Sequence, residues 1–123
     1  MSPFDPAKDE DRAYLATALT AFALGLRVED VMTGSRGTPV HARGRQIAMY
    51  LLRTGLGMSL ARVARVFRRD RTTVSHACHL VEDLRDDPDF DVWVEQLTLG
   101  LTSVAVLCEQ PETARVACAQ PGA

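Results

Sequence analysis

The sequence predicts an all-α protein, a small helical bundle that contains a helix-turn-helix. Apolar residues recur at intervals of three and four residues in several stretches, and no stretch alternates apolar and polar residues as a strand would. The 123 residues, 46% of them hydrophobic, suffice for one compact core but not for two ordinary domains. Between residues 59 and 84, two helical patterns flank a short, arginine-rich turn.

The first half of the chain is predicted to hold two long helices. One covers residues 9–26, where acidic residues occupy the first turn and suit the positive end of the helix dipole. A short helical turn at residues 28–32 and a polar connector at residues 34–39 follow, and the second long helix runs from about residue 39 to residue 55. Their apolar faces consist of Leu15, Leu19, Phe22 and Leu26 in the first helix and of Val40, Ile47, Ala48, Leu51 and Leu52 in the second.

Residues 59–84 are predicted to be the helix-turn-helix. Ser59 and Asp70 stand where they can cap its two helices, because their side-chain oxygens can accept unpaired backbone N–H groups of a first turn. Apolar residues at helical spacing follow each cap: Leu60, Val63, Ala64 and Phe67 in one helix, and Val74, Ala77, Cys78, Val81 and Leu84 in the other. Residues 71–73 then occupy the first turn of the second helix, from which a recognition helix reads DNA bases.

The last helix is expected over residues 90–108, after Pro88 has ended the preceding one. Its apolar residues are spaced three or four apart: Val94, Leu97, Leu101 and Val104. Residues 1–8 contain two prolines and are predicted to be a flexible tail. Residues 109–123 contain two prolines and no periodic pattern, and are predicted to be a disordered tail. One domain over residues 9–108 is therefore expected.

Positive charge is concentrated in one part of the chain. Residues 36–71 hold nine arginines and one acid, which gives +8, whereas the other residues include five basic and fifteen acidic ones, which gives −10. The net charge of −2 therefore hides a basic region of the kind that binds phosphate. Arginine guanidinium groups are forked and suit two-point contacts to phosphate or guanine. The alternative is a solvated basic face without a ligand.

Few other chemistries are favoured. The cysteines, Cys78, Cys108 and Cys118, form no C-x-x-C pair, so neither a disulfide framework nor a zinc site is predicted. His76 and His79 share a helix face but lack a third ligand, and no arrangement of residues favours catalysis. The acidic N-terminus lacks the apolar core of a signal peptide, and no apolar run reaches membrane-spanning length. A cytoplasmic protein without a metal, cofactor, small-molecule substrate or membrane partner is expected.

Three segments resemble one protein family. The segments ARGRQIAMYLLR (42–53), SLARVARVF (59–67) and RDRTTVSHAC (69–78) are similar to the C-terminal DNA-binding domain, domain IV, of the bacterial replication initiator DnaA. That family's pattern runs roughly A-R-x-R-Q-x-A-M-x-L, then S-x-x-x-I-G-x-x-F, then R-D-H-T-T-V-x-H-A. The resemblance extends from about Leu15 to Leu101 and implies a TrpR-like helix-turn-helix fold.

The resemblance also implies a site for double-stranded DNA. In the family, the recognition helix enters the major groove of a nine-base-pair box, an arginine–glutamine pair holds the backbone, and a basic loop residue reaches the minor groove. The matching positions are Asp70, Arg71 and Thr72 for base edges, Thr73 for a phosphate, Arg45 and Gln46 for the backbone, and Arg36 for the minor groove. Further DNA contacts are expected from Arg43, Arg62, Arg68 and Arg69.

Three departures from the family pattern bear on specificity. Arg71 replaces the motif histidine and could donate to guanine or to phosphate. Arg36 stands one place from the family's minor-groove arginine, in a loop with fewer basic residues. Arg62 replaces a common glutamate, and Arg68 replaces the glycine of the family's turn. Each added phosphate contact would steepen the salt dependence of binding by about one unit of log–log slope.

The chain contains no G-x-x-x-x-G-K-[ST] phosphate-binding loop, so no ATPase activity is expected. The sequence therefore predicts a free-standing DnaA-like protein that is not an enzyme. It is expected to bind DnaA-box-like sites in the nucleoid and to regulate replication initiation or transcription. The alternative is a protein-interaction module that binds DnaA or a DnaA regulator without specific DNA binding, through its acidic face or its final helix.

Overall fold

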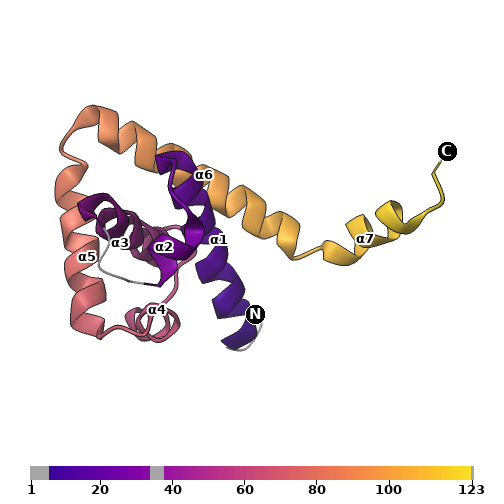
Figure 1. Ribbon diagram of the computed structural model, residues 1–123, viewed down its shortest axis with the longest axis horizontal. Coiled ribbons are helices and arrows are strands. Elements are labelled where there is room, and N and C mark those ends of the chain that lie inside the picture. Colours follow the sequence, from indigo (N-terminus) through magenta and orange to yellow (C-terminus); the bar gives the residue numbers. More distant parts are fainter. Residues whose placement is uncertain (1–5, 34–37, 123) are drawn as a thin grey trace.

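The computed structural model describes residues 6–33 and 38–122, and every regular element in those ranges is a helix (Figure 1). The predicted all-α fold is thus confirmed. The first long helix begins at Pro6, so the prediction of a flexible tail is wrong for residues 6–8. It ends at Leu24, two residues before the predicted end, and is followed by Gly25 with a left-handed φ of 71°. The helices are α1 (Pro6–Leu24), α2 (Val28–Met32), α3 (Pro39–Thr54), α4 (Leu60–Phe67), α5 (Arg71–Leu84), α6 (Pro88–Cys108) and α7 (Pro111–Ala119).

α3 forms the centre of the fold (Figure 1). It packs most extensively against α1 and α5, and six consecutive residues, Ile47 to Leu52, are all buried. A helix that is buried on every side needs neighbours on every side, which α1, α2, α4, α5 and α6 provide. Val40 is exposed although the spacing predicts it on the buried face, because the start of α3, with Thr38 and Pro39, faces solvent. Phe22 of α1 is exposed as well, so its predicted place in the apolar face is also wrong.

A polar network connects α3, α5 and α6. The hydroxyl of Tyr50, a buried residue of α3, donates to Glu82 of α5 and accepts a hydrogen bond from Arg85 at 2.9 Å. Arg85 also forms ion pairs with Asp91 and Glu95 of α6. Burial and the bond to Glu82 raise the pKa of Tyr50, so its hydroxyl keeps the proton that it donates. One arginine at the end of α5 therefore holds three helices together.

A second ion pair connects α1 to α4. The Asp9 side chain is 1% exposed, and Arg62 donates to it through Nε at 2.9 Å and through Nη2 at 2.5 Å. Arg12 donates to the same carboxylate at 3.2 Å. The hydrogen bonds from Arg62 hold the pKa of Asp9 below its usual value. A buried carboxylate with this geometry is stable only while its arginine partner is present.

Of the two helices of the helix-turn-helix, only α4 has a side-chain N-cap. The Oγ atom of Ser59 accepts the backbone N–H of Arg62 at 3.2 Å, so the predicted cap of α4 is present. Asp70 occupies the N-cap position of α5, but its side chain makes no capping hydrogen bond. The predicted carboxylate cap is therefore wrong: Asp70 is exposed, and its backbone carbonyl, not its side chain, accepts an N–H of α5, that of Val74 at 3.2 Å. The Asp70 carboxylate remains accessible to a ligand.

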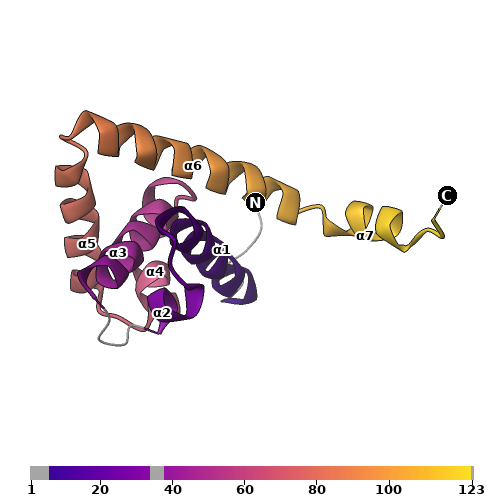
Figure 2. The ribbon, with the colours of Figure 1, turned by 45° about the horizontal axis from the view of Figure 1, so that its top comes forward.

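The C-terminal region departs most from the sequence-based expectation. α6 begins at Pro88, where the side chain of Asp87 accepts the backbone N–H of Asp89 at 2.9 Å. Its C-terminal part extends past the bundle, and α7 lies farther out (Figures 1 and 2). Because residues 111–119 form a helix, the prediction of a disordered segment is wrong for them. None of these residues is buried, which explains why no apolar stripe marks the helix.

α6 is also the one helix, within residues 6–33 and 38–122, that is long and apolar enough to cross a membrane by length and composition alone. Only 11% of its apolar stretch is buried. The prediction that no apolar run reaches such a length is therefore wrong for α6. Val94 and Leu101, its two buried residues, pack into the hydrophobic core.

Candidate nucleic-acid interface

The first turn of α5 is the exposed edge of the helix-turn-helix. Arg71, Thr72 and Thr73 all face solvent, whereas Val74, the next residue, is fully buried. α5 packs against both α3 and α4, and these contacts fix its orientation. The turn therefore presents a cation and two hydroxyl groups outward on a rigid support.

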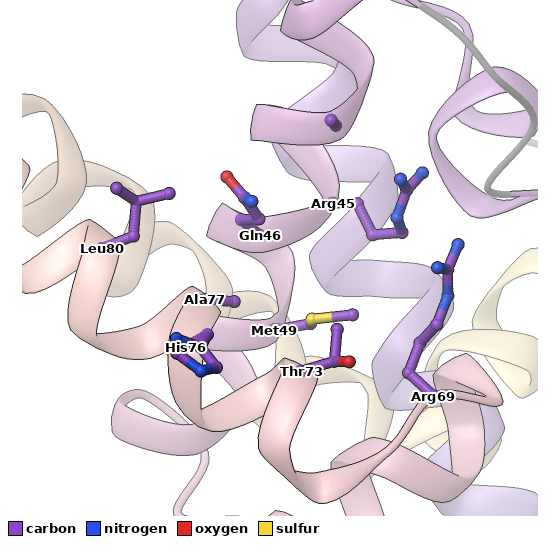
Figure 3. A pocket seen from close by; sticks show the side chains of 9 residues that line it. Arg45, Gln46, Met49, Arg69, Thr73, His76, Ala77 and Leu80 are labelled. Atoms are coloured by element: carbon purple, nitrogen blue, oxygen red, sulfur yellow. The ribbon is translucent and has the colours of Figure 1, made fainter.

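A cleft of about 460 Å³ lies between α3 and α5 (Figure 3). We call it the α3–α5 cleft. Arg45 and Gln46 line it from α3, Thr73 lines it from α5, and Arg69 lines it from the turn before α5. In Figure 3, the side chains of Arg45 and Arg69 point the same way, with their guanidinium groups side by side. The other lining residues are Ala42, Met49, His76, Ala77 and Leu80.

Two positive charges share this cleft. Arg45 is half-buried, and its Nη1 atom donates to the carbonyl oxygen of Val31 at 3.2 Å, which holds the side chain in place. Burial lowers the pKa of Arg45, and the charge of Arg69 lowers it further. Arginine carries a positive charge in proteins, so the two guanidinium groups repel each other across the cleft. A phosphate bound between them would replace that repulsion by charge-assisted hydrogen bonds.

A second cleft of about 390 Å³ lies on the other side of α5, and we call it the α4–α5 groove. It is lined by Leu60, Arg71, Thr72, Ser75, His76 and His79. His76 belongs to both clefts, so α5 forms a ridge between them. The major groove of DNA is about 12 Å wide and admits one helix of this kind. The ridge with its flanking clefts therefore has the shape and polarity of an inserted recognition helix.

The structure brings together most of the residues predicted to contact DNA. Arg45, Gln46, Arg69 and Thr73 share the α3–α5 cleft, and Arg71 and Thr72 share the α4–α5 groove. Asp70 and Arg68 are exposed in the turn that joins the two helices.

Two predicted residues in the described ranges, Arg62 and Arg43, do not join this group. Arg62 pairs with Asp9 and lines neither cleft, because a buried carboxylate on α1 is its partner. Arg43 also lines neither cleft, and its Nη1 atom is buried without a hydrogen-bond partner among the described residues. Arg36 lies outside the described residues.

Sequence reasoning missed three polar residues that line the clefts. Ser75, His76 and His79 continue the exposed strip that begins at Arg71 and Thr72. The available signal was helical spacing, because residues three or four apart share a helix face. Histidine is also a common metal ligand, so the residue type alone does not indicate that His76 and His79 lie beside the first turn of α5.

Arg68 has the single left-handed backbone conformation found at a non-glycine residue in the described ranges, with a φ of 55°. It ends α4, and its backbone N–H donates to the carbonyl oxygens of Ala64 and Arg65. A side chain in this conformation meets the following carbonyl oxygen, which costs roughly 1–2 kcal/mol. The turn is therefore formed at a cost that a glycine would avoid.

Replacing Arg68 by glycine is expected to stabilise the protein by about 1 kcal/mol and to raise the midpoint of thermal unfolding by about 4 °C. Calorimetry or circular dichroism would measure the shift. Arg68→Ala is the matched control, because it removes the same charge but keeps a Cβ atom in the left-handed region. Equal stabilisation by both variants would show that charge repulsion, not backbone conformation, is relieved.

The fold and the two arginine-lined clefts define a helix-turn-helix protein. The second helix of this motif, α5, packs against α3 and carries an exposed polar first turn.

The chain belongs to the family described as the bacterial dnaA protein helix-turn-helix, whose profile matches residues 16–81, more than half of the chain. It is 42% identical over 74 residues to the chromosomal replication initiator protein DnaA of Symbiobacterium thermophilum, a match that covers 58% of this chain and 16% of that protein. It is 37% identical over 78 residues to the DnaA of Bifidobacterium animalis subsp. lactis, with 62% and 13% covered.

Solved structures agree with this assignment. A crystal structure of a DNA replication initiation factor superposes with a TM-score of 0.71 and 31% identity over 80% of this chain and 30% of that one. The replication initiator DnaA bound to AMPPCP and single-stranded DNA superposes with a TM-score of 0.69 at the same identity and coverage. Of the two DnaA proteins compared by sequence, the match to this chain covers only 13–16% of their length, and the matched part is their helix-turn-helix.

Proposed function

We propose that this protein binds double-stranded DNA with sequence preference, by inserting α5 into the major groove. One observation carries the proposal: the paired guanidinium groups of Arg45 and Arg69 stand beside the exposed threonines of the first turn. Cations in that position can hold a phosphate, while Thr72 faces the base edges. Phosphate contacts set the register of a helix on DNA, and base contacts then select the sequence.

The roles of individual residues follow from where they lie. Arg45, Arg69 and Thr73 in the α3–α5 cleft would hold the DNA backbone. Arg71 and Thr72, on the side of α5 that faces the α4–α5 groove, would reach bases, and the exposed Asp70 carboxylate could accept from a cytosine amino group.

The biological role that we infer is regulation of replication initiation or of transcription, in association with DNA in the bacterial cytoplasm. The names of the relatives support it, since they are chromosomal replication initiators. The chain covers a small part of those proteins, so their complete activity is not attributed to it. We expect no ATPase activity from these 123 residues, because they contain no nucleotide-binding loop motif.

A titration of two DNA duplexes tests the proposal. One duplex contains a DnaA box, the other contains the same bases in scrambled order, and both are measured at about 150 mM salt because affinity depends strongly on ionic strength. We expect the box duplex to bind at least about tenfold more tightly. Equal affinities would contradict sequence preference and would favour the protein-interaction alternative.

Replacing Thr72 by alanine is expected to reduce the preference for the box by about tenfold, since one lost base contact costs roughly 1–3 kcal/mol. The binding of the scrambled duplex should hardly change. Thr73→Ala is the matched control, because it removes the same hydroxyl group from the adjacent exposed position in the α3–α5 cleft. It should weaken both duplexes alike. If Thr72→Ala also weakened the binding of both duplexes alike, Thr72 would contact the DNA backbone and not a base.

A further inference from the structure

We propose that the outward face of α6 is a homodimer interface on which a second copy of this chain packs antiparallel. The face consists of Val92, Leu99 and Val106, which are 59%, 58% and 57% exposed. We call it the α6 outer stripe. This inference concerns association of the protein with itself and does not depend on DNA binding.

The α6 outer stripe lies opposite the side that packs on the bundle. Val94 and Leu101 are the buried residues of α6, and each is two positions after a stripe residue. Two positions along a helix correspond to a rotation of roughly 200°. The core therefore uses one side of α6 and leaves an apolar stripe on the other.

The charge pattern of α6 also indicates a covered surface. The solvent face of a helix normally carries charged residues. The acids of α6 are Asp89, Asp91 and Glu95, all in its first half, and no charged residue occurs from Gln96 to Cys108. The second half of α6 therefore has no charged side chain on its exposed side, and the polar residues there are Gln96, Thr102 and Ser103.

The spacing of the stripe favours a second copy as the partner. Val92 and Val106 each lie seven residues from Leu99, so the stripe reads the same in both directions. A two-fold interface requires one patch that is complementary to itself. In an antiparallel pair, Leu99 meets Leu99 of the second copy, and Val92 meets its Val106.

Charge selects the antiparallel arrangement. With the two-fold axis at Leu99, Asp91 and Glu95 face the uncharged second half of the other helix. Both acids pair with Arg85 of their own chain, but the Glu95 side chain stays 53% exposed, and a parallel pair would place it beside the Glu95 of the other copy, which it would repel.

The contact is small, which sets its expected strength. Few apolar side chains contribute from each copy, and interfaces that bury less than about 1,200 Å² in total are weak and reversible. We therefore expect dissociation constants in roughly the micromolar range and a monomer–dimer equilibrium that depends on concentration.

Sedimentation equilibrium of the full chain, from about 5 to 500 μM, tests the association. Leu99→Glu is expected to weaken the dimer at least about tenfold. Because Leu99 is exposed, the thermal unfolding midpoint should not change. Val116→Glu on α7 is the matched control, since Val116 is equally exposed, at 57%, and receives the same charge. This control is expected to dimerise like the natural sequence.

Disulfide trapping tests the arrangement. In a background with Cys108→Ser and Cys118→Ser, both of them exposed in the natural chain, Leu99→Cys is expected to link to itself under mild oxidation. Val92→Cys should link to a Val106→Cys chain in a mixture, but not to itself. Self-linking of Val92→Cys would indicate a parallel pair and would overturn the proposal.

Two other results would also overturn it. One is a chain that remains monomeric at every concentration. The other is a monomer that binds phosphatidylcholine vesicles unless it carries Leu99→Glu, which would assign the α6 outer stripe to lipid. All of these measurements are made without DNA, so their failure would leave the proposed DNA binding untouched.

Discussion

Replacing Arg45 by glutamate is expected to weaken the binding of a DnaA-box duplex by about 100-fold, or roughly 2.7 kcal/mol. The variant removes a cation that the Val31 carbonyl holds in place and puts an anion where a phosphate would bind. Like charges at a desolvated contact cost several kcal/mol, although Arg69 would still attract the backbone. Fluorescence anisotropy with a labelled duplex measures the change.

The neutral variant refines this result. Arg45→Ala should lower the log–log slope of affinity against salt by about 0.9, the value for one lost phosphate contact. Arg69→Glu should reproduce the loss caused by Arg45→Glu, because both side chains line the α3–α5 cleft. Arg69 is exposed, so a folding defect cannot explain its effect.

Arg115→Glu is the matched control for these charge reversals. Arg115 is exposed on α7, which extends away from the bundle (Figure 2). The substitution changes the net charge by the same amount as Arg45→Glu, but we expect less than about a twofold loss of affinity, because separated surface charges are screened by salt. A loss equal to that of Arg45→Glu would mean that the overall field, not the cleft, attracts DNA.

Replacing Arg62 by alanine is expected to destabilise the protein by about 2 kcal/mol at pH 7. Asp9, whose side chain is 1% exposed, would lose its main partner and keep only Arg12. Breaking a buried ion pair costs about 3–5 kcal/mol, and we expect less here because the Arg62 side chain is 29% exposed. Urea unfolding measures the loss. Arg12→Ala, which removes the weaker partner of the same carboxylate, should cost less.

The effect should also depend on pH with a definite sign. Arg62 holds the pKa of Asp9 below the usual 3.8, so the pair stabilises the folded state above that value. This contribution is lost as pH falls below 3.8 through the folded pKa. The difference between the natural protein and Arg62→Ala should therefore shrink on acidification. A difference that stays constant down to about pH 3 would show that packing, not charge, is lost.

The same variant tests the predicted contact between Arg62 and DNA. The sequence pattern predicts that Arg62 contacts DNA, but the side chain is held by Asp9 and lines neither cleft. DNA affinity per folded molecule should consequently change little in Arg62→Ala. A loss comparable to that of Arg45→Ala would restore Arg62 to the interface.

Most helices could be predicted because their signals are local. The apolar spacing that places Val63 and Phe67 on one side of α4, and Val74 and Val81 on one side of α5, reports a helix whatever surrounds it. α7 could not be predicted in this way, because a helix with no buried face leaves no such spacing. Phe22 and Val40 carry the right pattern yet remain exposed, since burial depends on whether another helix lies opposite.

For the candidate site, the chain's own residues indicate its location and its chemistry. The arginines between residues 36 and 71 and the threonines after Asp70 mark the helix-turn-helix as the region suited to phosphate and bases. Which of those arginines line a cleft is decided only by the tertiary structure. Arg45 and Arg69 meet at one cleft although 24 residues separate them, whereas Arg62 turns to Asp9, 53 residues away. Helical patterning acts over three or four residues, but the partner of a long charged side chain is selected through space by the packing of whole helices.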